Sequence, residues 1–374
     1  MITNKFDLQT FDGLTLKAVS FQPEDKETIT GVLFIIHGFA EHSMRYQDMA
    51  KQMTDAGIAV VSMDQRGHGK SEGKQGHTPS MEAWIKDVHM MVHRGAKIFN
   101  VKKKGLPVYM FGHSMGGGIL FQYLIQYRPV YVRAAIASSP FLRLTKGSVG
   151  AVRLSFAKMM HKIHPGYTQS SELDSNLLTD DPKQNKKYDD DPLTFKKITV
   201  GNVISVLNGG VDTLENAQVL TEFEDFKLLF VIGKGDKLVD WEAVVELYEK
   251  IQDSKKIDLY LDKLSKHDLH HCSKKEEVIA MYINYLKTGE LTGQPERNIE
   301  DEDEEEEEEE KEEKKKNDKE EEESDSNSGE DEKEKEKKEE EEEEEKEKEK
   351  EKKEEEEEKE KEKEKEKEEE KEEK

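Results

Sequence analysis

The chain has 374 residues and a formal net charge of −26, but this charge is unevenly placed. Residues 301–374 hold 47 acidic and 21 basic residues, so the first 300 residues are electrically neutral. The acidic balance argues against nucleic acid as a partner. The single cysteine, Cys272, excludes an internal disulfide framework and a cysteine-based zinc site.

The chain also lacks the sequence marks of secretion and of membrane insertion. Its start has no basic region followed by an apolar one, as a signal peptide would. No apolar run approaches the roughly 18 residues that a membrane-spanning helix needs. We therefore expect a cytoplasmic protein, with peripheral contact to membranes as an option.

The first 291 residues predict an α/β domain. Asp12-Gly13 separates two strand-like runs, which indicates a hairpin. Helical patterns at 81–99 and 241–252 lie between later apolar runs. These runs are typical of strands buried on both faces of a parallel sheet, and they cover 31–36, 58–63, 107–111, 134–138, 227–232 and 257–261. The pattern predicts about eight strands, of which the first two are antiparallel.

Almost ninety residues separate the sixth strand from the seventh, so we expect an inserted helical cap at about 140–222. A basic amphipathic helix opens this insertion. Its apolar face would carry Val149, Val152, Phe156, Met159, Met160 and Ile163. Such a face could pack over the core, contact a membrane surface transiently, or do both. We expect loops around 180–195, where three consecutive aspartates suggest a calcium loop only weakly.

Residues 292–374 form a Glu/Lys-rich low-complexity tail. They contain too few apolar residues to bury, so we expect disorder or transient helices. The negative charge suits basic proteins as partners and could restrain the basic cap electrostatically.

The strongest chemical signal is the G-x-S-x-G match at residues 112–116. It follows the strand at 107–111 and precedes a helical run, so Ser114 would lie on a tight turn between a strand and a helix. The N–H of Met115 would then point at a developing oxyanion. The alternative is a glycine-rich turn that only packs the helix on the sheet. We predict that Ser114 is a catalytic nucleophile.

A catalytic serine needs a base and an orienting acid, and both follow later strands. Asp236 comes directly after 227–232, and His267 comes after 257–261. Both would lie at the carboxyl ends of parallel strands, where sites form. The order serine, aspartate, histidine is the one expected for this arrangement. Asp240 is the alternative to Asp236. We favour Asp236, because it lies in the first turn after the strand at 227–232.

Two further features concern the same region. His270 and His271 follow His267, and a metal site there lacks a supporting set of carboxylates or cysteines, so we expect a polar cluster at a helix start. A second oxyanion donor should follow the strand at 31–36, and the N–H of Phe39 is the candidate.

Six stretches together resemble the monoacylglycerol lipase and lysophospholipase group of the α/β-hydrolases, with a serine aminopeptidase S33-like hydrolase domain. The likeness covers about residues 10–288. The stretches are HGFAEHSMRY (37–46), DQRGHGKSEG (64–73), GHSMGGGI (112–119), YDDDPL (188–193), GKGDKLVD (233–240) and KHDLHH (266–271).

The resemblance implies an α/β-hydrolase fold and a serine hydrolase that cleaves fatty-acyl monoesters, such as monoacylglycerols or lysophospholipids. It implies Ser114, Asp236 and His267 as the triad, with oxyanion N–H groups on Phe39 and Met115. No cofactor and no metal are implied, because water completes the turnover. A carboxylesterase, a thioesterase or a small-peptide hydrolase is the alternative, followed by a non-catalytic interaction protein that acts through its tail.

The sequence departs from the group at three places. Ser265 stands where the group has a glycine two residues before the histidine. Cys272 and Ser273 occupy the zone in which a glutamate is frequent. Phe39 is larger than the residue usual at its position, which could narrow the pocket. These departures bear on the substrate more than on the triad.

Overall fold

The computed structural model describes residues 1–145, 151–171, 173–254 and 256–292. The predicted tail lies outside these ranges, and its boundary near residue 292 stays a prediction. In the described part of the chain no helix is both long and apolar enough to cross a bilayer.

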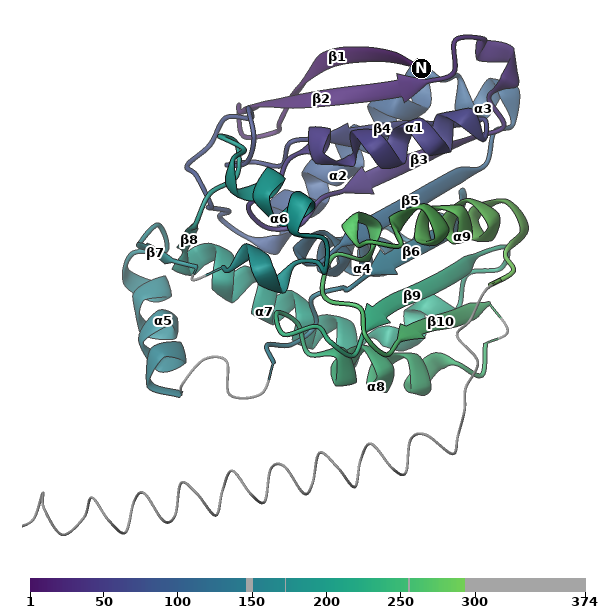
Figure 1. Cartoon of the computed structure of the whole chain (residues 1–374). Coiled ribbons are helices and arrows are strands. Elements are labelled where there is room, and N and C mark those ends of the chain that lie inside the picture. The colour runs from purple at the N-terminus through teal and green to yellow at the C-terminus, as the bar shows by residue number, and fades with distance from the viewer. Residues whose placement is uncertain (146–150, 172, 255, 293–374) are drawn as a thin grey trace, which may run out of the picture. The chain divides into compact units, whose positions relative to one another are not determined.

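An eight-stranded, mostly parallel sheet forms the centre of the domain, as the sequence predicted (Figure 1). Its order is β1-β2-β4-β3-β5-β6-β9-β10. Only the pairs β1–β2 and β2–β4 are antiparallel. The strands are β1 (Ile2–Gln9), β2 (Thr15–Gln22), β3 (Gly31–Ile36), β4 (Ile58–Met63), β5 (Val108–His113), β6 (Val132–Ser138), β9 (Lys227–Gly233) and β10 (Ile257–Asp262).

Helices cover both faces of the sheet. α1 (Gln47–Asp55) and α9 (Lys275–Thr288) pack on one face. α2 (Met81–Ile98), α4 (Met115–Tyr127) and α8 (Trp241–Ile251) pack on the other. The short helix α3 (Val101–Lys104) precedes β5. Single 3₁₀ turns lie at Lys26–Thr28, Ser43–Tyr46, Ser175–Leu177, Ala217–Thr221 and Leu269–His271.

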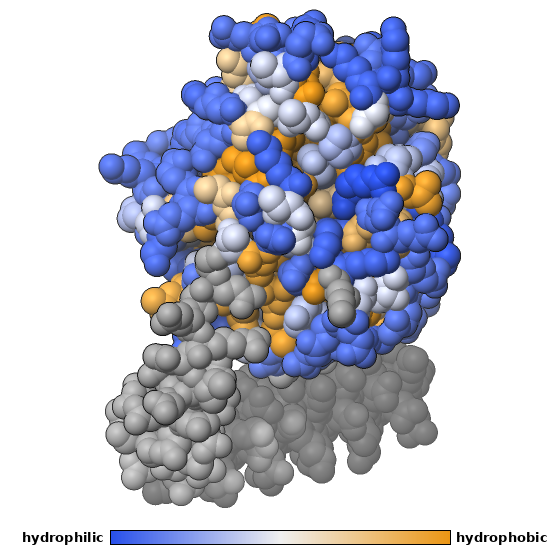
Figure 2. Space-filling view, turned by 90° about the vertical axis from the view of Figure 1, so that its right-hand side faces the viewer, coloured by the Kyte–Doolittle hydropathy of each residue, from blue (hydrophilic) through white to orange (hydrophobic). Residues whose placement is uncertain are grey.

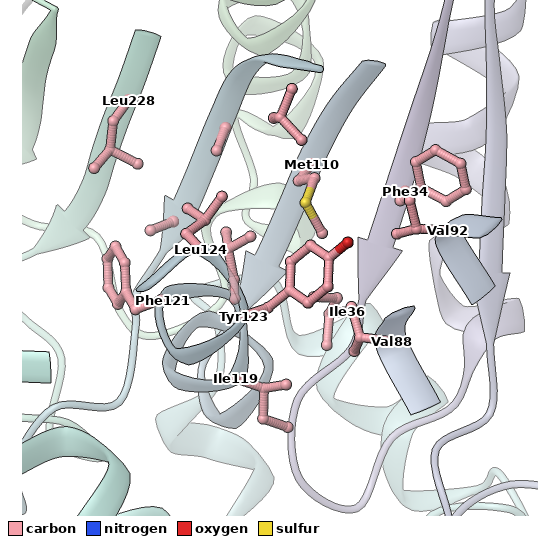
Figure 3. Close-up of a cluster of buried hydrophobic side chains, with 14 of the residues drawn as sticks. Phe34, Ile36, Val88, Val92, Met110, Ile119, Phe121, Tyr123, Leu124 and Leu228 are labelled. Carbon is pink, nitrogen blue, oxygen red and sulfur yellow. The ribbon is translucent and has the colours of Figure 1, made fainter. Parts of the chain in front are cut away.

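The core follows from the strand sequences. β3, β4 and β5 are buried at every position, because each lies between two helical layers. Figure 3 shows one of these layers, where Phe34 and Ile36 of β3 and Met110 of β5 face side chains of α2 and α4. This rigid centre fixes the loops at the carboxyl ends of the strands.

The insertion between β6 and β9 stands over the carboxyl ends of the strands, on the left of Figure 1. It contains α5 (Ala151–Ile163), α6 (Pro182–Asp189), α7 (Val200–Glu215) and a two-stranded sheet, β7 (Thr168–Ser170) with β8 (Lys197–Thr199). The cap is therefore mainly helical, as the sequence predicted.

The prediction of loops around 180–195 is wrong in part. Residues Pro182–Asp189 form α6, because Asp181 caps the helix by accepting a hydrogen bond from the N–H of Lys183, and Pro182 occupies the first turn. An aspartate followed by a proline is a helix-start signal that was present in the sequence.

Most of the described residues in the apolar face predicted for α5 do not pack in the core, and Met160 is half-buried. Leu154 and Ala157, which the predicted face did not include, line a cavity of the domain. Phe156, Met159 and Ile163 are instead exposed, at 42, 51 and 72 %. Val149 and the side chain of Val152 lie outside what the structure describes.

Candidate active site

Ser114 lies on a strained turn between β5 and α4. Its backbone φ is +52° with ψ −121°, a conformation that costs free energy for a residue with a Cβ atom. Gly116 allows the turn, because a Cβ at this position would lie 2.1 Å from the carbonyl oxygen of Ile36. The N–H of Ser114 donates to the carbonyl of Ser138 at 3.0 Å, which ties the turn to β6.

Asp236 and His267 meet at the same end of the sheet. The distance from His267 Nδ1 to Asp236 Oδ2 is 2.7 Å, and both side chains are buried. The other oxygen of Asp236 accepts from the N–H groups of Leu238 and Val239. Ser139 Oγ donates to the carbonyl of His267 at 2.6 Å. Nδ1 is therefore engaged by the carboxylate, and Nε2 is the ring nitrogen left for the cavity.

Asp240 caps helix α8 and pairs with Arg143 instead of with His267. Its Oδ1 accepts from the N–H groups of Glu242 and Ala243 at the start of α8. Its Oδ2 accepts from Arg143 Nε at 2.6 Å. The structure therefore brings Asp236, and not Asp240, to His267.

The electrostatics of His267 favour a protonated ring. Burial alone would lower its pKa, but the negative charge and hydrogen bond of Asp236 act in the opposite direction. The charges of Asp268 and Glu41 add to this effect, and the pKa of His267 is raised above its ordinary value of 6.5. Such a ring accepts a proton readily, as a general base must.

The loop after β3 lies against Ser114. A Cβ on Gly38 would be 3.3 Å from the Cβ of Ser114, so the two segments are in contact. The N–H of Gly38 donates to Glu41 Oε2, which fixes the loop. Within the described residues neither the N–H of Phe39 nor that of Met115 has a hydrogen-bond acceptor. Both predicted oxyanion donors are thus unengaged and lie beside the serine.

Sequence reasoning missed a buried charged network behind this loop. Arg45 Nε donates to Glu41 Oε1 at 3.1 Å, and Arg45 Nη2 lies 3.5 Å from Asp268. Tyr46 donates its hydroxyl proton to Glu41 Oε2. Burial disfavours the charge of Glu41 and would raise its pKa, but Arg45 together with His113 and His270 more than offsets this, so the pKa of the carboxyl is lowered. The four-residue spacing of Glu41 and Arg45 was the only local signal.

The histidines after the site are not the start of a long helix. His270 and His271 form a buried 3₁₀ turn, and His271 Nδ1 lies 2.7 Å from Asp268 Oδ2. Among the described residues His113, Asp268 and His270 are the one group of potential metal ligands, with ligand atoms within 4.8 Å of one another. Arg45 and His271 already partner the carboxylate of Asp268.

The three consecutive aspartates do not converge on one point. Asp189 accepts from the hydroxyl of Ser175, and Asp190 pairs with Lys186. Asp191 lies 2.9 Å from His42 Nε2. Each carboxylate has its own protein partner, which is the arrangement of a structured surface turn.

Ser114 and His267 open into a cavity of about 420 Å³ beneath the cap. Much of its lining is apolar and comes from the cap and from the loop after β9. These residues are Phe141, Leu144, Leu154, Ala157, Leu173, Leu177, Leu178, Ile198, Val203, Val206, Leu207, Leu238 and Val239. The arrangement suits a substrate that joins a reactive ester to a long apolar chain.

Comparison with known proteins gives a consistent picture. The family model described as "Serine aminopeptidase, S33" matches residues 27–272. The monoacylglycerol lipase of Mycolicibacterium smegmatis is 33% identical over 210 residues, which are 56% of this chain and 71% of the relative. The solved structure of a monoacylglycerol lipase from Paleococcus ferrophilus has a TM-score of 0.63 at 27% identity, covering 74% of this chain and 99% of that one.

A longer relative also matches. An uncharacterized abhydrolase domain-containing protein of Dictyostelium discoideum is 28% identical over 287 residues. This region is 77% of the present chain but only 29% of the relative, so the chain spans less than a third of that protein.

Proposed function

The chain belongs to the serine aminopeptidase S33 family of hydrolases, and from this premise we propose that it cleaves fatty-acyl monoesters through an acyl-enzyme on Ser114. The observation that carries the proposal is the Asp236–His267 pair, which opens with Ser114 into one apolar cavity. A monoacylglycerol or a lysophospholipid supplies both the ester and the single acyl chain that such a cavity takes.

In the proposed reaction Ser114 Oγ attacks the ester carbonyl carbon while His267 Nε2 takes the hydroxyl proton. Asp236 holds the imidazole in place and stabilises its positive charge. The N–H groups of Phe39 and Met115 donate to the oxyanion. The carbon–oxygen bond to the alcohol then breaks, and His267 returns the proton to that oxygen. Water repeats the sequence on the acyl-enzyme and releases the fatty acid.

Labelling with a fluorophosphonate probe tests this function. We expect labelling of the wild type and none of Ser114→Ala, with hydrolysis of monoacylglycerol lost in the same variant. The matched control is Ser273→Ala, at an exposed serine whose hydroxyl donates to Asp180. Ser139→Ala would not serve as a control, because the hydroxyl of Ser139 donates to the carbonyl of His267. A folded wild type that neither labels nor hydrolyses would contradict the proposal.

We also propose that the exposed face of α5 contacts the membrane surface that supplies the substrate. Phe156, Met159 and Ile163 present apolar side chains to solvent, and the exposed Lys158 and Lys162 flank them. This combination suits an anionic bilayer surface.

The test compares one substrate in vesicles with a short soluble ester. Phe156→Asp with Met159→Asp should lower activity on vesicles and leave the soluble ester unaffected. Val130→Asp is the control, because Val130 is 82 % exposed and lies before β6, at the opposite end of the strands. Equal losses on both substrates would remove the docking role.

The acidic tail remains a candidate for binding basic proteins or for weakening contact with anionic lipid. Truncation after residue 300 should leave ester hydrolysis unchanged and raise binding to anionic vesicles at low salt. Unchanged vesicle binding would rule out the second role.

A further inference from the structure

A second pocket, of about 740 Å³, lies beside the proposed active site. It is lined by Lys74, Gln75, Thr168, Gln169, Ser170, Phe195, Lys196 and Lys197. Three of these eight residues are lysines, and no carboxylate is among them. Lys74 donates to the carbonyl of Gly166 at 2.5 Å, whereas Lys196 and Lys197 have no ion-pair partner among the described residues. Within the described residues, no carboxylate therefore neutralises the charge of Lys196 and Lys197.

The hairpin of β7 and β8 contributes residues to both pockets. Gln169 pairs with Ile198 in its register, and Ser170 pairs with Lys197. Ile198 lines the catalytic cavity and Lys197 lines the basic pocket, while Gln169 and Ser170 border both.

Aromatic contacts place the basic pocket close to the oxyanion loop. Phe195, which lines the basic pocket, packs edge-to-face on Phe39, with ring centroids 5.5 Å apart. Phe39 lines the catalytic cavity and carries a proposed oxyanion N–H. This ring contact therefore places the basic pocket next to the loop that borders Ser114.

The catalytic cavity also carries polar groups on this side that nothing in the described chain satisfies. Asn202 of α7 is fully buried, and neither its Nδ2 nor its Oδ1 has a partner. The hydroxyl of Ser171 is likewise buried and unpaired. A buried amide that has no partner in the described protein can use both its donor and its acceptor on a polar ligand in the cavity. A glycerol hydroxyl can both donate to and accept from such an amide.

We propose that these groups form a headgroup subsite and that the preferred substrates are acyl monoesters whose glycerol carries a phosphate. This inference rests on the proposed ester hydrolysis and names the substrate class of the same site. The acyl chain occupies the apolar cavity and the ester lies at Ser114. The glycerol passes Asn202 and Gln169, and the phosphate binds Lys196 and Lys197. Lysine side chains bind phosphate by charge-assisted hydrogen bonds.

The test uses two soluble esters below their critical micelle concentrations, hexanoyl glycerol and hexanoyl glycerol 3-phosphate. The wild type should have a kcat/KM about tenfold or more higher for the phosphate ester at low salt. Lys196→Ala with Lys197→Ala should remove about tenfold of that preference, chiefly through KM, and change the neutral ester less than twofold. The preference should also fall with added salt.

Lys102→Ala with Lys103→Ala is the matched control. This adjacent, exposed pair lies on α3 at the right of Figure 1, whereas β7 and α5 lie at the left. Figure 2 shows that right-hand side, where hydrophilic residues predominate with apolar residues between them. The same charge is removed there, far from the cap, so the control should keep the preference of the wild type.

Each outcome decides a separate statement. Hydrolysis of neither ester would overturn the proposed function, and the inference with it. Hydrolysis of the neutral ester with no phosphate preference, or with a preference that the Lys196/Lys197 variant keeps, would overturn the inference alone. A variant that loses binding to phosphatidylglycerol vesicles but keeps its preference in solution would assign the lysines to the bilayer, and would also overturn it.

Discussion

Replacing Asn202 by leucine should make the protein more stable and less active. The amide of Asn202 is fully buried and has no partner among the described residues, and a buried amide without a hydrogen bond costs about 1–3 kcal/mol. Leucine removes that cost, favours the helix more strongly than asparagine, and can extend its added atoms into the adjoining cavity. The backbone bond from the N–H of residue 202 to Thr199 Oγ1 is retained.

The expected gain in unfolding free energy is about 1–3 kcal/mol, or a rise in Tm of roughly 3–8 °C for a domain of this size. The expected loss in kcat/KM for monoacylglycerol is about tenfold to a hundredfold, because a substrate hydroxyl would then be buried unpaired. Calorimetry and initial rates on the same preparation measure the two effects.

Asn185→Leu provides the comparison. Asn185 is also buried in the cap, and its Oδ1 is likewise unpaired among the described residues, but its Nδ2 donates to the carbonyl of Thr179 at 3.0 Å. Loss of that hydrogen bond should lower Tm. A lower Tm for Asn202→Leu would refute the reasoning about an unpaired amide. A higher Tm with unchanged kcat/KM would show that the amide does not meet the substrate.

Three further outcomes follow from the site. Asp236→Asn should lower kcat about 10³- to 10⁴-fold. Asp240→Asn keeps the N-cap of α8 and loses only the charge that pairs with Arg143, so it should cost at most about 1 kcal/mol of stability with little change in kcat. Initial rates and urea unfolding measure the two effects. Because a general base must be neutral, kcat/KM should rise with pH through the pKa of His267, which lies above 6.5. Asp268→Asn removes a negative charge that raises this pKa, so the rise in kcat/KM should move to lower pH. A pH profile that is the same in the variant would contradict this. Gly116→Ala should cost more than about 2 kcal/mol in urea unfolding, and a native-like midpoint would count against the close approach to Ile36.

The sheet could be predicted because its central strands are short, continuous runs of mainly apolar residues that are visible in the local sequence. A run such as 31–36 is apolar at every position, and only a strand between two helical layers buries all of it. The position of Ser114 followed from glycines that a tight turn requires. The choice of Asp236 over Asp240 followed from its place in the first turn after a strand, and the distance to His267 agrees with it.

The cap was harder to predict because its elements depend on tertiary contacts. β7 and β8 have three residues each and a mixed sequence, too short for a periodic signal. The apolar residues of α5 divide between a cavity and solvent, which a helical wheel does not separate. The pair of Arg45 with Asp268 joins residues 223 positions apart, so no local pattern contains it.

The residues proposed to carry out the reaction and the residues proposed to recognise the substrate belong to different segments of the chain. Ser114, Asp236 and His267 follow β5, β9 and β10, and their geometry is held by strands and by Ser139. The apolar walls, the hairpin of β7 and β8 and the lysines beside it come mainly from the single insertion after β6. Reaction and recognition are thereby modular. A cap of another length or polarity could be transplanted between β6 and β9 and redirect the same ester chemistry to a new lipid.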